Sequence, residues 1–324
     1  MTTISVIVPA YNAEQTILET IESIQKQSFS KLEIIVINDG STDRTLEILN
    51  TIKDDRLKIF NYENGGLPVA RNRGISHAIG DYMAFIDADD IWTPDKLSSQ
   101  LTALQTHPEA GFAYSWTSFM DEKAETFHSG NPIYFEGDVY AHLLVSNFIA
   151  SGSNPLIRRE VIEHVGKFDT TLRSAEDWDY WLRIARLWHF ALVPKAQVFY
   201  RKSSGAMSAK IDVMEKYNLI VIEKAFQAAP AHLQYLKKQS QAGVYQYMAQ
   251  LALMYAPASQ KAQQTAEKLQ KAIRLYPQLL TQTKSQTLII KFLLIKVLSP
   301  YIANYIMQLI SQIRASRILK ATRE

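Results

Sequence analysis

Apolar runs alternate with amphipathic stretches over the first part of the chain. Four short runs rich in β-branched or aromatic residues have the length of buried strands, and they cover residues 4–8, 32–37, 57–60 and 82–86. Between them lie polar turns and helical spacings; for example, Asn12 can cap a helix that contains Ile17, Ile21 and Ile24. Alternation with such short connections predicts a parallel, doubly wound sheet flanked by helices.

The pattern changes along the rest of the chain. Residues 94–107 and 158–165 are expected to be helices, and residues 111–115 a further strand. The irregular stretch at 117–145 suits a loop or hairpin that covers a pocket. Residues 211–324 lack strand-like alternation and are expected to be helical, with a helical hairpin at 246–275. We therefore expect an α/β domain over residues 1–205 and a helical C-terminal region over residues 206–324.

Polar clusters follow all four predicted strands. They lie at residues 9–12, 39–41, 64–66 and 87–90. In a parallel doubly wound sheet, ligands bind outside the carboxyl ends of the strands, so these clusters should meet at one edge. Their convergence predicts a ligand site there.

The last of these clusters contains Asp87, Asp89 and Asp90. Carboxylates this close repel one another and raise one another's pKa unless a cation lies among them. Mg²⁺ or Mn²⁺ suits a site built from oxygen ligands. The alternative is a solvated acidic turn in which Asp90 or Thr93 caps the next helix.

A second acidic pair, Glu176 and Asp177, opens an aromatic-rich helix. Ser174 followed by Asp177 has the spacing of a capping box, so these acids could serve only the helix start. A carboxylate beside an apolar pocket could equally act as a general base. The spacing alone leaves both interpretations open.

Composition and motifs exclude several classes of protein. A formal charge of +3 over 324 residues is too small for a nucleic-acid footprint. The chain has no cysteine, which excludes disulfides, thiolate nucleophiles and cysteine-bound zinc. Neither a P-loop nor a Gly-x-Gly-x-x-Gly sequence is present, which argues against an ATPase or a dinucleotide enzyme.

The N-terminal residues and the apolar C-terminal stretch indicate where in the cell the protein is expected. No signal-peptide pattern is recognisable, so a cytoplasmic location is expected. Residues 288–313 are strongly apolar but contain no stretch of 18 uncharged apolar residues, which argues against a transmembrane span. An amphipathic helix pair is expected instead. It could pack internally, form a homodimer, or make a membrane-surface segment at 288–320, anchored by Lys291, Lys296, Arg314, Arg317 and Lys320.

Five short motifs occur together in this chain. They are VIVPAYN at 6–12, DGSTD at 39–43, ARNRG at 70–74, DADD at 87–90 and EDW at 176–178. In this order and spacing they resemble family 2 glycosyltransferases with the GT-A fold, and the resemblance covers about the first 205 residues.

The resemblance implies an inverting enzyme that uses a nucleotide-diphosphate sugar, most simply a UDP-sugar, with Mn²⁺ or Mg²⁺. It assigns Pro9, Tyr11 and Asp39 to the base, Arg71 to the diphosphate, Asp87 to the ribose or the metal, Asp89 to the metal, and Asp177 to the catalytic base with Glu176 beside it. Many relatives have a histidine where this chain has Ser203. That departure removes one expected metal ligand, and Arg201 or Lys202 could help to neutralise phosphate instead.

We therefore expect a hexosyl or N-acetylhexosaminyl transferase that builds a surface polysaccharide or lipopolysaccharide of the cell envelope. Its acceptor would be a hydroxyl of a glycan or a lipid-linked glycan. Inversion needs one displacement and one base, so no covalent nucleophile is required. The alternatives are a nucleotidyltransferase-like enzyme that handles diphosphates and an inactive sugar-binding scaffold.

Overall fold

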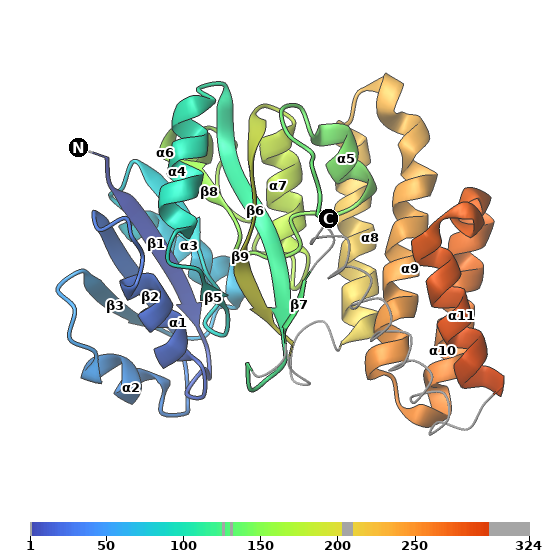
Figure 1. Ribbon diagram of the computed structural model, residues 1–324, viewed down its shortest axis with the longest axis horizontal. Coiled ribbons are helices and arrows are strands. Elements are labelled where there is room, and N and C mark those ends of the chain that lie inside the picture. The colour runs from blue at the N-terminus through green and yellow to red at the C-terminus, as the bar shows by residue number, and fades with distance from the viewer. Residues whose placement is uncertain (1, 125–126, 130–131, 203–209, 298–324) are drawn as a thin grey trace, which may run out of the picture. The chain divides into compact units, whose positions relative to one another are not determined.

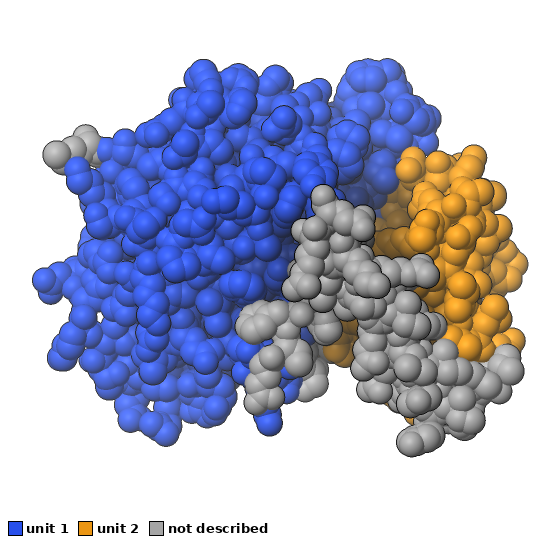
Figure 2. All heavy atoms as spheres, in the orientation of Figure 1, with its two compact units in different colours: residues 1–206, 216–236 blue, residues 207–215, 237–324 orange. Residues whose placement is uncertain are grey.

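The computed structural model describes residues 2–124, 127–129, 132–202 and 210–297. The chain divides into two compact units, coloured separately in Figure 2. One unit comprises residues 1–206 and 216–236, and the other comprises residues 207–215 and 237–324. The domain boundary expected near residue 205 stays a prediction.

The first unit is built on one sheet, in which β6 and β9 are the longest of the described strands (Figure 1). Its strands are β1 (Ile4–Ala10), β2 (Leu32–Asp39), β3 (Leu57–Tyr62), β4 (Tyr82–Phe85), β5 (Ile91–Trp92), β6 (Ala110–Met120), β7 (Phe127–Ser129), β8 (Leu156–Arg158) and β9 (His189–Arg201). The order is β3-β2-β1-β4-β8-β6-β9-β5, with β7 paired to β6. The four predicted strands β1 to β4 pair in parallel, which confirms the predicted half of the sheet. The other half is mixed, because β8 runs antiparallel to both β4 and β6.

Helices cover both faces of this sheet. In the first unit they are α1 (Ile17–Gln25), α2 (Thr45–Thr51), α3 (Leu67–His77), α4 (Lys96–Thr106), α5 (Tyr140–Val145), α6 (Arg159–Val165) and α7 (Glu176–Ala185). Alternate residues of β1 point to opposite faces. Val6 and Val8 join the core that contains α1 and α4, while Ile7 meets α3 so closely that a Cβ at Gly74 would collide with it.

Two details differ from the sequence-based expectations. Asn12 does not cap the first helix; Thr16 occupies that position. Asn12 instead adopts a positive φ of 49° and accepts a hydrogen bond from the Thr42 backbone N–H at 2.8 Å. The stretch at 117–145 is also more ordered than expected, since β6 continues to Met120 and α5 begins at Tyr140. Pairing with the long strand β9, which a local pattern cannot reveal, extends β6.

The C-terminal elements are helical, as predicted. They are α8 (Ile211–Ala228), the 3-10 helix η2 (Ala231–Leu236), α9 (Lys237–Tyr255), α10 (Ala258–Leu275), the 3-10 helix η3 (Pro277–Thr281) and α11 (Thr283–Val297). The second unit has two small apolar cores. One joins α9, α10 and η3 around Ala242 and Ala272, and the other joins α9, α10 and α11 around Ala249 and Leu269. No described helix combines the length and the apolar character that crossing a membrane requires. The segment expected at 288–320 lies outside the described residues beyond position 297.

Candidate functional site

The predicted polar clusters do meet at one edge of the sheet. Asp39 ends β2, and its neighbour Asn38 pairs with Ala10 at the end of β1. Strand β4 lies on the other side of β1 and leads within two residues to Asp87. The Asp87 backbone N–H donates to Ser153 Oγ at 2.9 Å, which fixes the start of the acidic cluster.

Asp39 organises the side of the site assigned to the nucleotide base. Its carboxylate is nearly fully buried and accepts hydrogen bonds from the backbone N–H groups of Gly65 and Gly66 at 3.0 and 2.8 Å. Arg73 Nη1 also donates to Asp39 Oδ1, at 2.6 Å. Tyr11 lies near the end of β1 with its side chain 55% exposed. Asp39 thus shapes the turn before α3, and Tyr11 presents an open aromatic ring.

The acidic cluster at 87–90 is unevenly buried. Asp90 is fully buried and accepts hydrogen bonds from Ser153 Oγ at 2.5 Å and from the Arg201 backbone N–H at 3.0 Å. Burial, followed by the charges of Asp89 and Asp87, raises the pKa of Asp90 well above its usual range. Burial and the Asp87 charge also raise the pKa of Asp89, to about 6. Asp90 is therefore part of the packed interior rather than a cap of the next helix.

Arg71 joins the acidic cluster to helix α7. Its guanidinium is buried and donates to Asp87 Oδ1 at 2.8 Å through Nη2 and to Glu176 Oε1 at 2.7 Å through Nη1. Burial opposes its charge, but Asp87, Glu176 and Asp177 outweigh burial and raise its pKa. A Cβ at Gly152 would collide with this guanidinium, so a glycine is needed where the chain passes it.

Arg201 fixes the backbone of the acidic cluster from the end of β9. Its Nε donates to Asp89 O at 2.9 Å and its Nη1 to Glu122 O at 2.7 Å. Its Nη2 pairs with Glu19 on α1 at 2.6 Å. Since the guanidinium is only 4% exposed, Arg201 holds Asp89 in place through protein contacts.

Asp177 lies in the first turn of α7. Its Oδ1 accepts the Trp178 backbone N–H at 2.7 Å, and Asn147 Nδ2 lies 3.5 Å from its Oδ2. Burial raises its pKa, partly opposed by Arg71. Burial likewise raises the pKa of the neighbouring Glu176, to about 7. Ala175, not Ser174, holds the N-cap position, and no side-chain hydrogen bond caps the helix, so the capping-box interpretation is wrong.

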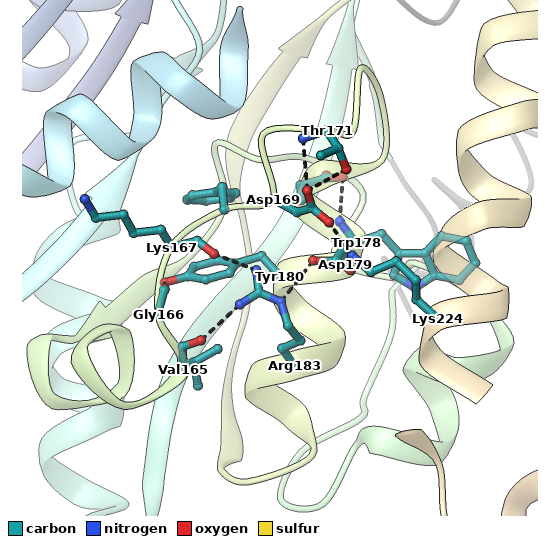
Figure 3. A network of polar contacts seen from close by, with 12 residues as sticks. Val165, Gly166, Lys167, Asp169, Thr171, Trp178, Asp179, Tyr180, Arg183 and Lys224 are labelled. Carbon is teal, nitrogen blue, oxygen red and sulfur yellow. Dashed lines mark hydrogen bonds and ion pairs between the residues drawn. The ribbon is translucent and has the colours of Figure 1, made fainter. Parts of the chain in front are cut away.

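A polar network around Asp179 and Arg183 also fixes the orientation of α7 (Figure 3). Asp179 Oδ2 pairs with Arg183 Nε at 2.9 Å, and Asp179 Oδ1 pairs with Lys224 of α8 at 2.7 Å. Lys224 also reaches Asp169 in the preceding loop, at 2.5 Å. Arg183 further donates to the carbonyl groups of Val165 and Lys167 at 3.1 and 2.9 Å. The start of α7 is therefore held by charged contacts as well as by packing.

Two carboxylates could hold a divalent cation. Asp87 and Asp89 are both partly exposed, and the raised pKa of Asp89 reflects a charge that a cation would stabilise. Among the described residues, no cluster of three or more His, Asp or Glu side chains has metal-binding geometry, and Ser203 lies outside those residues. The pair fits Mg²⁺ or Mn²⁺ if phosphate and water complete the coordination, as is common for Mg²⁺.

Several residues of the site escape sequence reasoning. Asn147 contacts Asp177, and Gly152 lies against the guanidinium of Arg71. Ser153 donates a hydrogen bond to Asp90, and Glu19 pairs with Arg201. Three of them lie in the loop before β8, where spacing carries no signal. Glu19 lies on α1, where the spacing of apolar residues predicts which face is buried but not the partner of a charged side chain.

Comparison with known proteins covers most of the chain. The family model described as "Glycosyltransferase like family 2" matches residues 5–250. An uncharacterized glycosyltransferase of Rickettsia felis is 36% identical over 191 residues, which are 57% of this chain and 30% of the relative. The UDP-Glc:alpha-D-GlcNAc-diphosphoundecaprenol beta-1,3-glucosyltransferase WfaP of Escherichia coli is 41% identical over 116 residues, which are 36% of this chain and 46% of that protein. The chain thus spans less than half the length of either relative.

Solved structures share the fold at low identity. TarS 1-349 of S. aureus, in complex with UDP-GlcNAc, has a TM-score of 0.56 and 21% identity, and the match covers 91% of this chain and 80% of that one. The mannosyltransferase PcManGT of Pyrobaculum calidifontis, in complex with GDP-Man and Mn²⁺, has a TM-score of 0.58 and 22% identity, with coverages of 90% and 86%. These matches confirm the predicted GT-A fold. Because the family model matches most of its length, the chain belongs to glycosyltransferase-like family 2.

Proposed function

We propose that this protein is an inverting glycosyltransferase that transfers a hexose or N-acetylhexosamine from a UDP-sugar to a glycan hydroxyl. The observation that carries the proposal is the link from Asp87 through Arg71 to the Glu176–Asp177 pair. It joins the end of β4, where a donor diphosphate would bind, to a carboxylate of raised pKa. Support for the donor comes from a relative named for UDP-Glc and from a TarS structure that holds UDP-GlcNAc.

In this mechanism Asp177 acts as the general base. Its carboxylate takes the proton of the acceptor hydroxyl while the hydroxyl oxygen attacks the anomeric carbon. The bond from that carbon to the β-phosphate oxygen breaks, and UDP leaves with the electron pair. The raised pKa of Asp177 makes it a stronger base than an ordinary aspartate. The base must be ionised, so we expect transfer to increase as the pH rises through this pKa.

The donor would be held by residues of the sheet edge. Pro9, Tyr11 and Asp39 would bind the base, with the exposed Tyr11 ring available for stacking. A divalent cation at Asp89 and Asp87 would neutralise charge on the departing diphosphate. Because both of its Nη atoms already bind carboxylates, we assign Arg71 an indirect role in which it aligns Asp87 with Glu176.

Arg201 would act on phosphate only through Asp89. Its side-chain nitrogens are committed to Asp89 O, Glu122 O and Glu19. The role proposed for Arg201 is therefore to hold the metal-binding turn, and direct neutralisation of phosphate would fall to other groups.

The acceptor would be a lipid-linked or growing surface glycan, as the name of the relative WfaP suggests. Peripheral contact with the cytoplasmic face of a membrane would bring the enzyme to such an acceptor. Helix α11 supports this contact, since Ile290 and Leu293 are 53% and 49% exposed beside the exposed Lys291 and Lys296.

The test is a transfer assay with UDP-sugars on the wild type and on Asp177→Asn. Loss of a general base should lower kcat by about 10²- to 10⁴-fold, while calorimetry shows UDP binding nearly unchanged. Asp95→Asn, at the start of α4 and outside the site, is the matched control. Wild-type enzyme in EDTA should also lose transfer. Full turnover by Asp177→Asn would contradict the role of the base, and full turnover in EDTA would contradict the metal.

A further inference from the structure

A short segment at residues 132–138 is fixed to the sheet although it forms no helix or strand of its own. Its three anchors are the Trp116 Nε1 hydrogen bond to Ile133 O at 2.8 Å, the Tyr114 hydroxyl bond to Phe135 O at 2.5 Å, and the two Gly137–Phe190 backbone bonds at 2.8 and 2.9 Å. Two of these anchors come from aromatic side chains of β6. The backbone is therefore held on both sides of residue 134.

Tyr134 projects from this fixed segment. Its side chain is 69% exposed, and its ring lies 5.3 Å from that of Trp116 with the planes at 83°. Trp116 itself is partly exposed. An aromatic ring exposed on a segment held this firmly has little freedom to lose on binding, which favours a role as a preorganised contact surface.

The same aromatic group leads to the proposed base. Phe135 packs edge-on against Phe148 at 5.2 Å, and Tyr114 lies 5.5 Å from the same ring. Residue 147, next in the chain, is the asparagine beside Asp177. Asn147 Oδ1 is buried and has no hydrogen-bond partner within the described part of the chain. The aromatic group is thus followed directly by Asn147, which offers this hydrogen-bond acceptor, and by the proposed base Asp177 beside it.

We propose that Tyr134 and Trp116 form a platform for a pyranose ring of the acceptor glycan. The apolar C–H face of a pyranose packs on an aromatic ring, while its hydroxyl groups need polar partners. The exposed Glu136 carboxylate, two residues after Tyr134, is available for such hydroxyls. This inference rests on the proposed function, because it places the sugar acceptor on the side of the site that carries Asp177.

Binding of simple sugars tests the platform directly. Saturation-transfer NMR would use the 324-residue chain with UDP and a mixture of methyl α-pyranosides of glucose, galactose, mannose and N-acetylglucosamine. For the pyranoside that the wild type binds, Tyr134→Ala should raise the Kd by about 3- to 10-fold, as expected for one lost ring contact. Tyr134→Phe keeps the ring and should bind like the wild type. Tyr235→Ala removes a tyrosine that is 76% exposed on η2 and serves as the control.

The outcomes separate this proposal from the proposed function. Equal binding by Tyr134→Ala and wild type, or no binding of any pyranoside by the wild type, overturns the platform. Tyr134-dependent binding by a protein that transfers no sugar from any UDP-sugar would support the platform and contradict the transferase. Normal transfer with an unchanged acceptor KM in Tyr134→Ala would leave the transferase standing and overturn the platform.

Discussion

Charge compensation in a buried setting governs the site at the scale of single residues. Arg71 is buried between Asp87 and Glu176, and each of these carboxylates depends on it for stabilisation. Removing one partner of such a group leaves an uncompensated buried charge, which typically costs about 3–5 kcal/mol. The raised pKa values of Asp89, Glu176 and Asp177 show that the compensation is incomplete. Perturbed carboxylates of this kind are typical of functional sites.

Lys96 shows the opposite situation, a buried amine with no carboxylate partner among the described residues. It is fully buried, its Nζ lies 3.8 Å from the Trp92 ring centroid, and its hydrogen bond to Pro155 O is long, at 3.4 Å. Burial lowers its pKa well below 10.5. Between that lowered pKa and 10.5 the unfolded chain binds more protons than the folded one, so this group makes stability increase with pH.

We therefore predict that Lys96→Met stabilises the protein at pH 7. Methionine has a similar length and no charge, and the free energy of unfolding should increase by about 1–3 kcal/mol. The gain should shrink as the pH approaches 10.5, where the lysine of the unfolded chain also loses its proton. Thermal melts at pH 7 and pH 10 measure both effects, with the exposed Lys53→Met as control. A lower melting temperature for Lys96→Met at pH 7 would contradict the prediction.

At the scale of elements, the orientation of α7 decides where the proposed base points. The helix begins after a left-handed residue, Ala175, and no side chain caps it. Its placement comes from contacts at a distance along the chain, such as Trp178 Nε1 to Leu143 O of α5 at 2.9 Å and Lys224 of α8 to Asp179.

Removing the contact from α8 should misplace the base without touching it. We predict that Lys224→Met lowers kcat by about 10- to 100-fold, the effect that a shift of about 1 Å can have. UDP binding should change little, since the donor residues lie on other elements. Steady-state kinetics and calorimetry would separate these two effects.

Two further variants complete this experiment. Lys224→Arg keeps the charge and should restore most of the activity, whereas Lys216→Met changes an exposed lysine on the same helix and should leave kcat as in the wild type. A kcat for Lys224→Met equal to that of the wild type would show that the contact from α8 is not needed to orient α7.

At the scale of the whole molecule, the question is what the C-terminal unit adds to a catalytic fold. Its helices have apolar cores of their own, yet α11 leaves Ile290 and Leu293 about half exposed. Exposed apolar side chains beside lysines are typical of a helix that lies on an anionic membrane surface.

We predict that the 324-residue chain sediments with vesicles containing phosphatidylglycerol. Ile290→Ser combined with Leu293→Ser should lower the bound fraction severalfold, because two apolar anchors are lost. Ile79→Ser removes a side chain that is 72% exposed in the first unit and should have no effect. A wild type that stays in the supernatant, or a double variant that binds equally, would contradict membrane contact. A concentration-dependent dimer abolished by the same double variant would assign this face to self-association instead.

The local pattern of the sequence determined the four parallel strands, the helical C-terminal region and the position of most motifs. Strand runs, turn residues and helical spacing are local properties of the sequence. Because the carboxyl ends of parallel strands lie at one edge of the sheet, where ligands bind, the positions of the motifs after the strands predicted that they meet there. Only the tertiary structure decided that β6 extends through its pairing with β9, and that Asp177 does not belong to a capping box.

Tertiary structure also decided the partners of the charged groups. Arg71 and Glu176 are 105 positions apart and Arg201 and Glu19 are 182 positions apart, so no local pattern could pair them. The platform at Tyr134 likewise depends on side chains of β6 that hold a segment without secondary structure. Local chemistry singled out the candidate groups, whereas long-range packing set their burial, their pKa values and what each can contact.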